Sequence, residues 1–330
     1  MALSHAGHRL RAGSITGQTA DPPHADDGPP LTFARRTEVR LLVVLATALV
    51  LLALSACSPR HLIVQAVAGE LASQGQVAED DLQLAREASA FYLKLSESLL
   101  VQAPGHLALS EAVSAGFTQY AFAFVAFEAE KIESRDAKAA HALRERAARL
   151  YRRAHRHAMA ALEHDQPGFA RALASNRQAQ WPQLVDRQVA MAYWAAASWG
   201  GLISMSKDDP DTVADLPLAI RLARLAWERQ PDYADGGLSS LLGSFEAARP
   251  GGSRQQALVY FDRALAAGRG RNAGVLVAKA EGLALPDGDR TAFEDLLRAA
   301  LAAGAAHGDL ANAVMRERAL WLLGTADDLF

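Results

Sequence analysis

The chain has 330 residues, of which 50% are hydrophobic and 22% are charged, and its formal net charge at pH 7 is −3. This near balance excludes the strongly basic field of a nucleic-acid-binding protein, so we expect no nucleic-acid partner. The single cysteine excludes an intramolecular disulfide and a cysteine-rich metal site. Alanine, leucine and arginine dominate and β-branched residues are scarce, which predicts an all-helical fold.

Residues 1–34 are rich in proline, glycine, aspartate and histidine, a composition typical of disorder. A signal peptide rarely carries such a leader. We therefore expect either a disordered leader or a translation start placed too early, with the real start near Val39 or upstream of Arg35.

Residues 41–56 form an apolar run that follows Arg35, Arg36 and Arg40. A positive flank, a short apolar stretch and small residues before a cleavage point are typical of a secretory signal. The run is also short for a bilayer crossing, which needs about 20 apolar residues. The sequence therefore predicts a signal peptide over residues 35–56.

The run ends in Leu54-Ser55-Ala56-Cys57, which matches the lipobox of bacterial lipoproteins. In that motif the cysteine thiol is acylated and the chain is cut just before it, so Cys57 is the predicted lipidation site. Two or more acyl chains anchor a protein firmly to a membrane. The alternative is an uncleaved anchor in which Cys57 is only a small residue. The serine that follows Cys57, where aspartate would retain the protein, fits sorting to the outer membrane.

The remaining residues, 57–330, are expected to form one helical-repeat domain with short, antiparallel connections. Breaks such as Ala103-Pro104-Gly105 and Pro250-Gly251-Gly252 separate the helices. The predicted spans are 61–75, 80–102, 106–132, 136–165, 182–206, 213–230, 234–248, 253–267, 273–284, 288–303 and 309–323.

Small side chains recur in the second helix of successive pairs. The tetratricopeptide repeat requires small or aromatic residues at offsets of about 0, 4 and 7 in that helix. The sets with this spacing are Ala154, Ala158 and Ala161; Ala219, Ala223 and Ala226; Ala257, Phe261 and Ala264; and, more loosely, Ala292, Leu296 and Ala299. The spacing predicts about four helical pairs arranged as a tetratricopeptide-like α-solenoid or bundle.

Several blocks also resemble the T-component family of tripartite ATP-independent periplasmic (TRAP) transporters, the TatT-like lipoproteins. They run from about residue 80 to the C-terminus and include Leu95-Ser96-Glu97-Ser98-Leu99-Leu100, residues 193–200 (YWAAASWG), Pro231-Asp232-Tyr233 and Leu242-Gly243. His106 and Ser239 depart from the family pattern, His106 standing where asparagine is expected. The resemblance implies a periplasm-facing lipoprotein that associates with the substrate-binding protein of a TRAP transporter. It also implies a homo-oligomer that encloses a hydrophobic channel or pocket.

Aromatic side chains are the candidates for a binding groove. Tyr193, Trp194 and Trp199 lie on one predicted helix, and rigid aromatic rings are efficient anchors for an apolar ligand or a partner segment. Filling gaps between repeats is the alternative role for all three. Tyr120 and Phe124 belong to a helical stripe for which the core is the default position, and Tyr233 is the remaining candidate.

No catalytic constellation is evident, so we expect neither an enzyme nor a cofactor. His155, His157 and His164 lack a third ligand on one helical face and lie beside three arginines, which argues against a metal site. Glu97 lies between leucines and is expected to be buried with a partner, in a capping or inter-helix role.

The function predicted from these observations is that of a lipid-anchored, periplasm-facing TRAP component that docks a substrate-binding protein. It would also bind a hydrophobic or organic-acid ligand. The alternative is a tetratricopeptide-like scaffold for envelope assembly, such as outer-membrane protein insertion or pilus biogenesis. An enzyme, for instance an accessory of cell-wall hydrolysis, is the third possibility.

Overall fold

The structure is a computed structural model, and it describes Val44, residues 67–69 and residues 81–330. The chain divides into two compact units, Met1–Ser58 and Pro59–Phe330, and nearly all that is described belongs to the second. Apart from Val44, which is helical, the predicted leader, signal peptide and Cys57 lie outside the described residues. Of the helix expected over residues 61–75, Val67, Ala68 and Gly69 are described, and they are helical.

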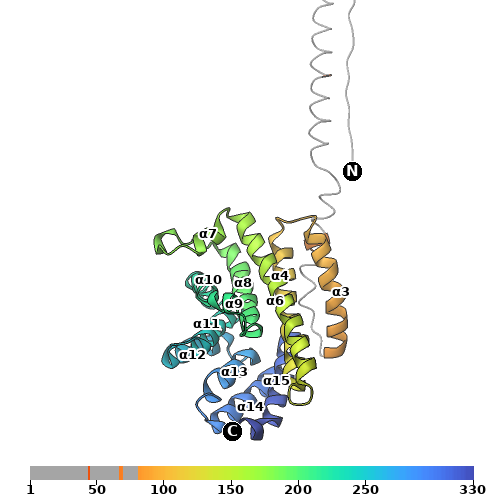
Figure 1. Cartoon of the computed structure of the whole chain (residues 1–330), viewed down its shortest axis with the longest axis vertical. Helices are drawn as coiled ribbons and strands as arrows, with labels where there is room; N and C mark the ends of the chain where they lie inside the picture. Colours follow the sequence, from red (N-terminus) through yellow and green to blue (C-terminus); the bar gives the residue numbers. More distant parts are fainter. Residues whose placement is uncertain (1–43, 45–66, 70–80) are drawn as a thin grey trace, which may run out of the picture. The chain divides into compact units, whose positions relative to one another are not determined.

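The second unit is built from α-helices, and no strand occurs over residues 81–330. This confirms the predicted all-α class. The main helices are α3 (Leu82–Leu100), α4 (Leu107–Ala121), α5 (Phe127–Ile132), α6 (Ala137–Asp165), α8 (Asp186–Met205), α10 (Leu216–Arg229), α11 (Gly237–Ala248), α12 (Arg254–Gly268), α13 (Ala273–Lys279), α14 (Arg290–Ala306) and α15 (Leu310–Gly324). Figure 1 shows α8 to α12 beside the layer of α3, α4 and α6, with α13 to α15 below them.

Short elements complete the unit, and the sequence did not predict them. They are α7 (Phe169–Leu173), the 3-10 turn η2 (Gln178–Gln180), α9 (Pro210–Ala214) and α16 (Ala326–Leu329). Two of the expected long helices also contain a π-helical turn, η1 (Phe122–Ala126) before α5 and η3 (Ala280–Ala284) after α13. The helix expected over 106–132 is confirmed, since residues 107–132 are helical without a break, and the π-helical turn in its interior is a detail that the sequence did not predict.

Side-chain caps explain where most helices begin. A polar side chain at the position before the helix accepts a hydrogen bond from a backbone N–H of the first turn, which would otherwise lack a partner. These caps are Asp81, His106, Asp136, Asp209, Ser253, Asn272, Asp289 and Asp309. His106 Nδ1 accepts a hydrogen bond from Leu109 N at 3.1 Å. His106 therefore caps the helix, a role that asparagine commonly has.

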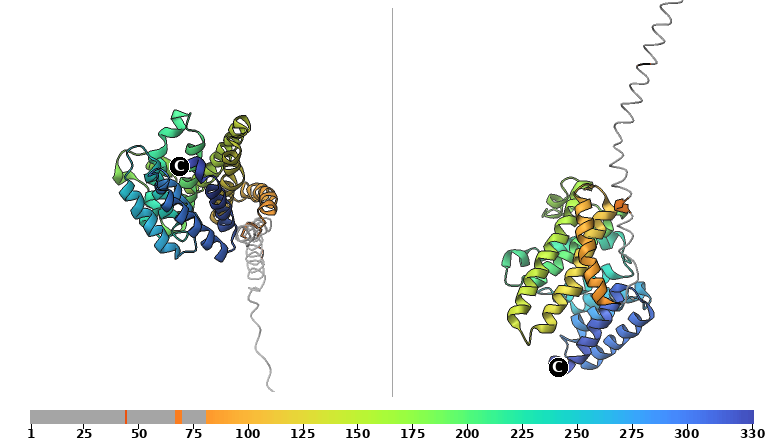
Figure 2. Two further views of the ribbon diagram at one scale, coloured as in Figure 1. Left: turned by 90° about the horizontal axis from the view of Figure 1, so that it is seen from below. Right: turned by 90° about the vertical axis from the view of Figure 1, so that its right-hand side faces the viewer.

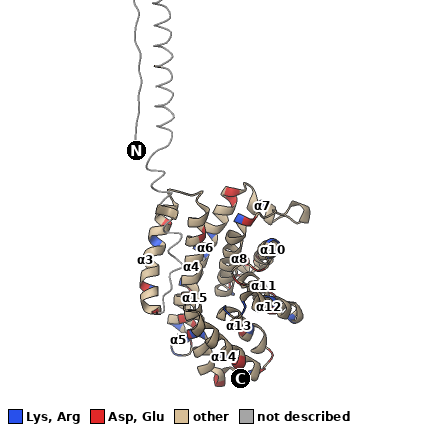
Figure 3. Cartoon of the chain, turned by 180° about the vertical axis from the view of Figure 1, so that it is seen from behind, with Lys and Arg blue, Asp and Glu red and all other residues tan. Residues whose placement is uncertain are grey.

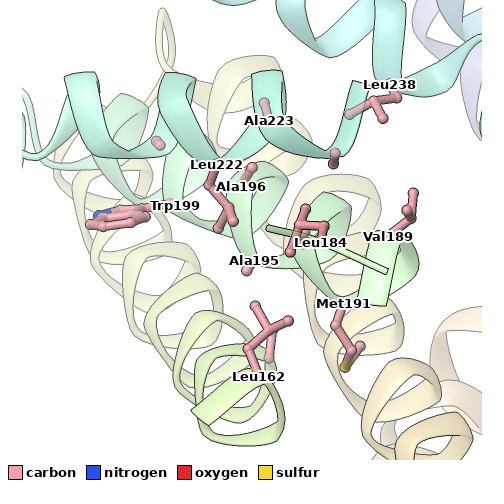
Figure 4. Packing of buried hydrophobic residues seen from close by; sticks show 14 of the residues in the cluster. Leu162, Leu184, Val189, Met191, Ala195, Ala196, Trp199, Leu222, Ala223 and Leu238 are labelled. Carbon is pink, nitrogen blue, oxygen red and sulfur yellow. The ribbon is translucent and has the colours of Figure 1, made fainter. Parts of the chain in front are cut away.

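The core follows the chain as a series of clusters between neighbouring helices. The largest joins α6, α8, α10 and α11, and Figure 4 shows Leu162, Ala195, Ala196 and Leu222 packed within it. The small or aromatic residues at the repeat positions of α6, α10 and α12 are all nearly or fully buried: Ala154, Ala158, Ala161, Ala219, Ala223, Ala226, Ala257, Phe261 and Ala264. Small side chains at these positions let the helices approach closely, as the repeat pattern requires.

In α14 the predicted register is wrong by one residue. Ala292 and Leu296 are only partly buried and Ala299 is exposed, whereas Phe293, Leu297 and Ala300 are fully buried. The buried set keeps the same spacing of four and three residues but contains one small side chain instead of two. Packing against α13 and α15 selects the larger side chains for this end of the array.

The C-terminal helices return to the N-terminal ones. Helix α15 contacts α3, and two ion pairs join it to α5: Arg318 Nη2 to Glu130 Oε2 at 2.8 Å, and Lys131 Nζ to Glu317 Oε1 at 3.0 Å. The helical array is therefore tied end to end instead of remaining an open solenoid.

Candidate functional site

Two of the predicted aromatic residues, Tyr193 and Trp194, lie on α8 and are partly buried. Their ring centroids are 4.8 Å apart in an edge-to-face arrangement, a geometry that stabilises aromatic pairs. The ring of Tyr233, in the turn before α11, lies 5.3 Å from that of Tyr193. The structure thus brings together three of the six aromatic candidates, which we call the Tyr193 cluster: Tyr193, Trp194 and Tyr233.

A carboxylate from a third element, helix α4, completes this cluster. The Tyr233 hydroxyl donates a hydrogen bond to Glu111 Oε1 of α4 at 3.3 Å. Gly237, the first residue of α11, leaves room for the Tyr193 ring, because a Cβ atom there would lie 3.2 Å from the Tyr193 hydroxyl oxygen. Glu111 was missed by sequence reasoning, since 122 residues separate it from Tyr233 and no local pattern connects them.

Burial sets the protonation of these groups. It raises the pKa of Glu111, although the hydrogen bond from Tyr233 opposes this effect. Burial also raises the pKa of Tyr193 to about 12, and it raises that of Tyr233 together with the nearby Glu111 charge. Both tyrosines therefore remain neutral hydrogen-bond donors at neutral pH, in a site with a large aromatic surface.

The other three aromatic candidates lie in the core. Trp199 is 7% exposed, and its ring lies 4.3 Å from that of His155; Figure 4 shows it at the edge of the largest cluster. Tyr120 and Phe124 are 8% and 9% exposed and pack edge to face at 5.4 Å. The structure does not bring these three residues to the Tyr193 cluster, and their surroundings are those of packing residues.

Glu97 is buried and connects α3 to α6, which agrees with the expected inter-helix role. Lys94 Nζ lies 2.7 Å from it, His157 Nε2 lies 2.8 Å from it, and Arg153 holds it in a bidentate ion pair. Burial alone would raise the pKa of Glu97, but these hydrogen bonds outweigh it and lower the pKa to about 2. His155 faces another way, with Nδ1 3.1 Å from the carbonyl oxygen of Ala195, so the histidines of α6 serve separate contacts.

A second polar cluster surrounds Arg318 of α15, which is 6% exposed. Its guanidinium bonds Glu281 of η3 at 2.6 and 3.0 Å and Glu130 of α5 at 2.8 Å. It also lies over the rings of Phe127, Phe122 and Trp321 at 5.1 to 6.0 Å. Desolvation opposes its charge, but the two carboxylates raise the pKa of Arg318, so the residue stays cationic.

The two departures from the family pattern have structural roles. His106 caps α4 as described above, and Ser239 is fully buried at the start of α11. The Ser239 hydroxyl accepts from Trp227 Nε1 at 2.9 Å and donates to the carbonyl oxygen of Pro231 at 2.9 Å. Neither residue touches the Tyr193 cluster in these contacts.

A shallow depression of about 190 Å³ lies elsewhere, between α10 and the loop that precedes α8. It is lined by Trp181, Pro217, Ile220, Arg221, Arg224, Leu225 and Glu228. The guanidinium of Arg221 stacks on the Trp181 ring at 4.2 Å. None of the aromatic candidates lines this depression.

No helix within the described part of the chain has both the length and the apolar character needed to cross a bilayer. Apart from Val44, the predicted signal segment is outside that part.

Comparison with known proteins agrees with the helical architecture and its extent. The family model described as "TRAP transporter T-component" matches residues 78–330, which is every main helix from α3 onward. The chain is also 29% identical over 265 residues to an uncharacterized protein of Treponema pallidum (strain Nichols), covering 76% of this chain and 81% of that one. The family is defined by a transporter component and not by a catalytic activity, and such a component works at the cell envelope. The chain belongs to the TRAP transporter T-component family.

Proposed function

We propose that this protein is a lipid-anchored T component that faces the periplasm and docks the substrate-binding protein of its TRAP transporter. Family membership over residues 78–330 carries this proposal, because it associates the chain with a TRAP transporter. The lipobox that ends in Cys57 supplies the anchor. The serine that follows Cys57 would direct the anchored protein to the outer membrane. The role is non-covalent, and no step in it needs a cofactor.

The Tyr193 cluster is the proposed contact surface for a hydrophobic or organic-acid ligand, or for the partner segment that carries it. Partly exposed aromatic rings give a large contact area at a low cost in conformational entropy. A tyrosine whose pKa is about 12 stays protonated and can donate to a carboxylate. Self-association into a homo-oligomer would add avidity for a membrane-bound partner.

Affinity capture tests the partner. The acylated protein, solubilised from membranes in mild detergent, is expected to retain a TRAP substrate-binding protein from a periplasmic extract. Trp194→Ala should reduce retention, whereas Trp181→Ala, which removes a partly buried indole outside the cluster, should not. Recovery of outer-membrane or pilus assembly proteins, without a TRAP binding protein, would favour the scaffold function and contradict this proposal.

Cys57→Ala tests the anchor. Without the thiol no acyl chain can be attached, so the variant should keep its fold and either leave the membrane fraction or remain there with an uncleaved signal. Membrane fractionation with mass spectrometry of the N-terminus distinguishes these products. A Cys57→Ala protein that still fractionates as a mature membrane protein is incompatible with lipid anchoring.

A further inference from the structure

The outer side of α3 carries a stripe of exposed apolar residues along its length. Leu84, Phe91 and Leu95 are 52%, 70% and 43% exposed, and their spacing of seven and four residues places them on one side of the helix. Ala88 and Ser98 lie on the same side and are also exposed. The stripe, defined as Leu84, Ala88, Phe91, Leu95 and Ser98, is itself uncharged, and the exposed Glu87 and Lys94 lie along one of its borders.

The opposite side of α3 accounts for its attachment to the fold. Ala85, Leu93 and Leu100 are buried in the cluster shared with α4 and α6, and Glu97 ties the helix to α6 as described above. Helix α3 lies at the edge of the helical unit in Figure 1 and in the left view of Figure 2, and Figure 3 shows its few charges as short bands. The stripe is therefore a free face on a firmly held helix.

Exposed large apolar residues are concentrated at this part of the molecule. Val67 and Val101, at 46% and 77% exposure, lie before and just after α3. In the described part of the chain beyond α3, the other exposed large apolar residues do not form a stripe. Val185 precedes α8, Val259 and Leu320 are single side chains on α12 and α15, and Leu329 and Phe330 are the last two residues of the chain. Single exposed apolar residues are ordinary, whereas a contiguous apolar strip marks an interaction surface.

The position of Ala68, which connects the chain before α3 to the core, indicates what covers the stripe. Ala68 is fully buried in the same cluster as the inner side of α3. Cys57 precedes Val67 by ten residues, and an extended chain spans at most about 3.5 Å per residue, so acyl chains on Cys57 hold the bilayer within roughly 35 Å of Val67. This step rests on the proposed lipid anchor.

We propose that α3 lies against the phospholipid bilayer, with Leu84, Phe91 and Leu95 inserted among the headgroups and upper acyl chains. Such interfacial helices bury one apolar side and keep the other on the protein or in water. The acyl chains supply attachment, and the stripe supplies orientation. The contact turns one side of the domain to the membrane and leaves α8, α10 and α11, with the Tyr193 cluster, for a periplasmic partner.

Fluorescent labelling of single cysteines tests this contact, because Cys57 is the only cysteine and acylation removes its thiol. The acylated protein is reconstituted into vesicles of phosphatidylethanolamine and phosphatidylglycerol. An environment-sensitive dye is placed at Leu84→Cys, Phe91→Cys or Leu95→Cys. Val259→Cys and Leu320→Cys, at 51% and 57% exposure on α12 and α15, are the matched controls. Dyes on α3 should shift to the blue and lose emission to nitroxide-labelled lipid, and the control dyes should do neither.

Equal quenching at α3 and control positions, or none at either, overturns the proposal. A blue shift on α3 that grows with protein density but is not quenched by nitroxide lipid means that a second copy covers the stripe, which also overturns it. Dye uptake by the protein without an added cysteine would show that Cys57 is not acylated, and would remove the anchor itself. Capture of the TRAP binding protein is measured separately, so failure here leaves that part of the proposed function testable.

Discussion

At the scale of single residues, Glu97 shows how one buried carboxylate is stabilised by contacts from two helices. It is 7% exposed, and a buried charge is tolerated only when paired and hydrogen-bonded. Lys94 lies one turn earlier on α3, while Arg153 and His157 come from α6. The sequence indicated that Glu97 would be buried, because leucines flank it. It could not identify Arg153 and His157, which are 56 and 60 residues away.

Glu97→Gln is expected to destabilise the protein at neutral pH by about 2 kcal/mol, since it weakens charge-assisted hydrogen bonds. The pKa of Glu97 falls from 4.5 to about 2 on folding. Its contribution to the free energy of unfolding is therefore fully present above pH 4.5 and is lost as the pH falls toward 2. Urea unfolding from pH 7 to pH 3 should show the difference between the variant and the parent shrinking with acid.

Glu87→Gln is the matched control, because Glu87 is exposed on the same helix. It should change the unfolding free energy by less than about 0.5 kcal/mol at any of these pH values. A Glu97→Gln protein that behaves like Glu87→Gln would show that the charge of Glu97 does not stabilise the α3–α6 contact.

At the scale of elements, close approach between helices depends on two glycines in the C-terminal half of α8. A Cβ atom on Gly201 would lie 2.5 Å from the Tyr151 ring, and one on Gly200 would lie 2.6 Å from the Phe245 ring. Tyr151 is 4% exposed and Phe245 is 7% exposed, so neither ring has solvent-exposed space into which it can move.

Gly201→Ala should therefore destabilise the protein by about 1–3 kcal/mol through overpacking, even though alanine is the better helix former. Gly324→Ala is the control, since Gly324 ends α15 and a Cβ atom added there would meet no neighbouring atom within 4 Å. That substitution should leave the midpoint of urea unfolding unchanged or slightly higher. Equal effects from the two changes would mean that α6 and α8 do not pack closely at Gly201.

The helices themselves were largely predictable, because proline, glycine and capping residues separate amphipathic segments. The positions that each helix buries were harder to predict. In α14, Ala292, Leu296 and Ala299 satisfied the small-residue pattern, but the buried set is Phe293, Leu297 and Ala300. In an alanine-rich helix two registers fit the same pattern, and only the neighbouring helices decide between them. The sequence likewise could not tell which aromatic candidates line a surface and which fill the core. Three of them lie in the Tyr193 cluster and three lie in the core.

At the scale of the whole molecule, Arg318 joins the two ends of the helical array. It pairs with Glu130 near the start of the unit and with Glu281 near its end. The Arg318 side chain is 8% exposed, whereas those of Glu130 and Glu281 are 39% and 30% exposed. Removing Arg318 therefore leaves two partly solvated carboxylates without this partner and costs about 1–3 kcal/mol. Replacing all the charged partners together avoids that cost.

Arg318→Met is accordingly expected to lower the free energy of unfolding by about 1–3 kcal/mol, and adding Glu130→Gln and Glu281→Gln should recover most of the loss. Arg290→Met serves as the control: its ion pairs with Glu294 and Asp327 involve an arginine that is 48% exposed, so solvent screens them and its loss should leave the midpoint of urea unfolding nearly unchanged. Urea unfolding measures all three proteins. An Arg318→Met protein as stable as Arg290→Met would show that the ends are not held together by this cluster.

The two π-helical turns make this closure tolerant of a change in chain length. In η1 the Phe127 N–H bonds the Phe122 carbonyl five residues back, so the turn holds one residue more than an α-helical turn. A deletion from a regular α-helix would rotate everything after it by about 100°, but the wide turn of η1 already absorbs one residue. Removing that residue would convert η1 to α-helix and leave Glu130 facing nearly the same way. The same holds for η3, which contains Glu281. A relative that lacks the extra residue of η1 is therefore expected to keep the Glu130–Arg318 pair.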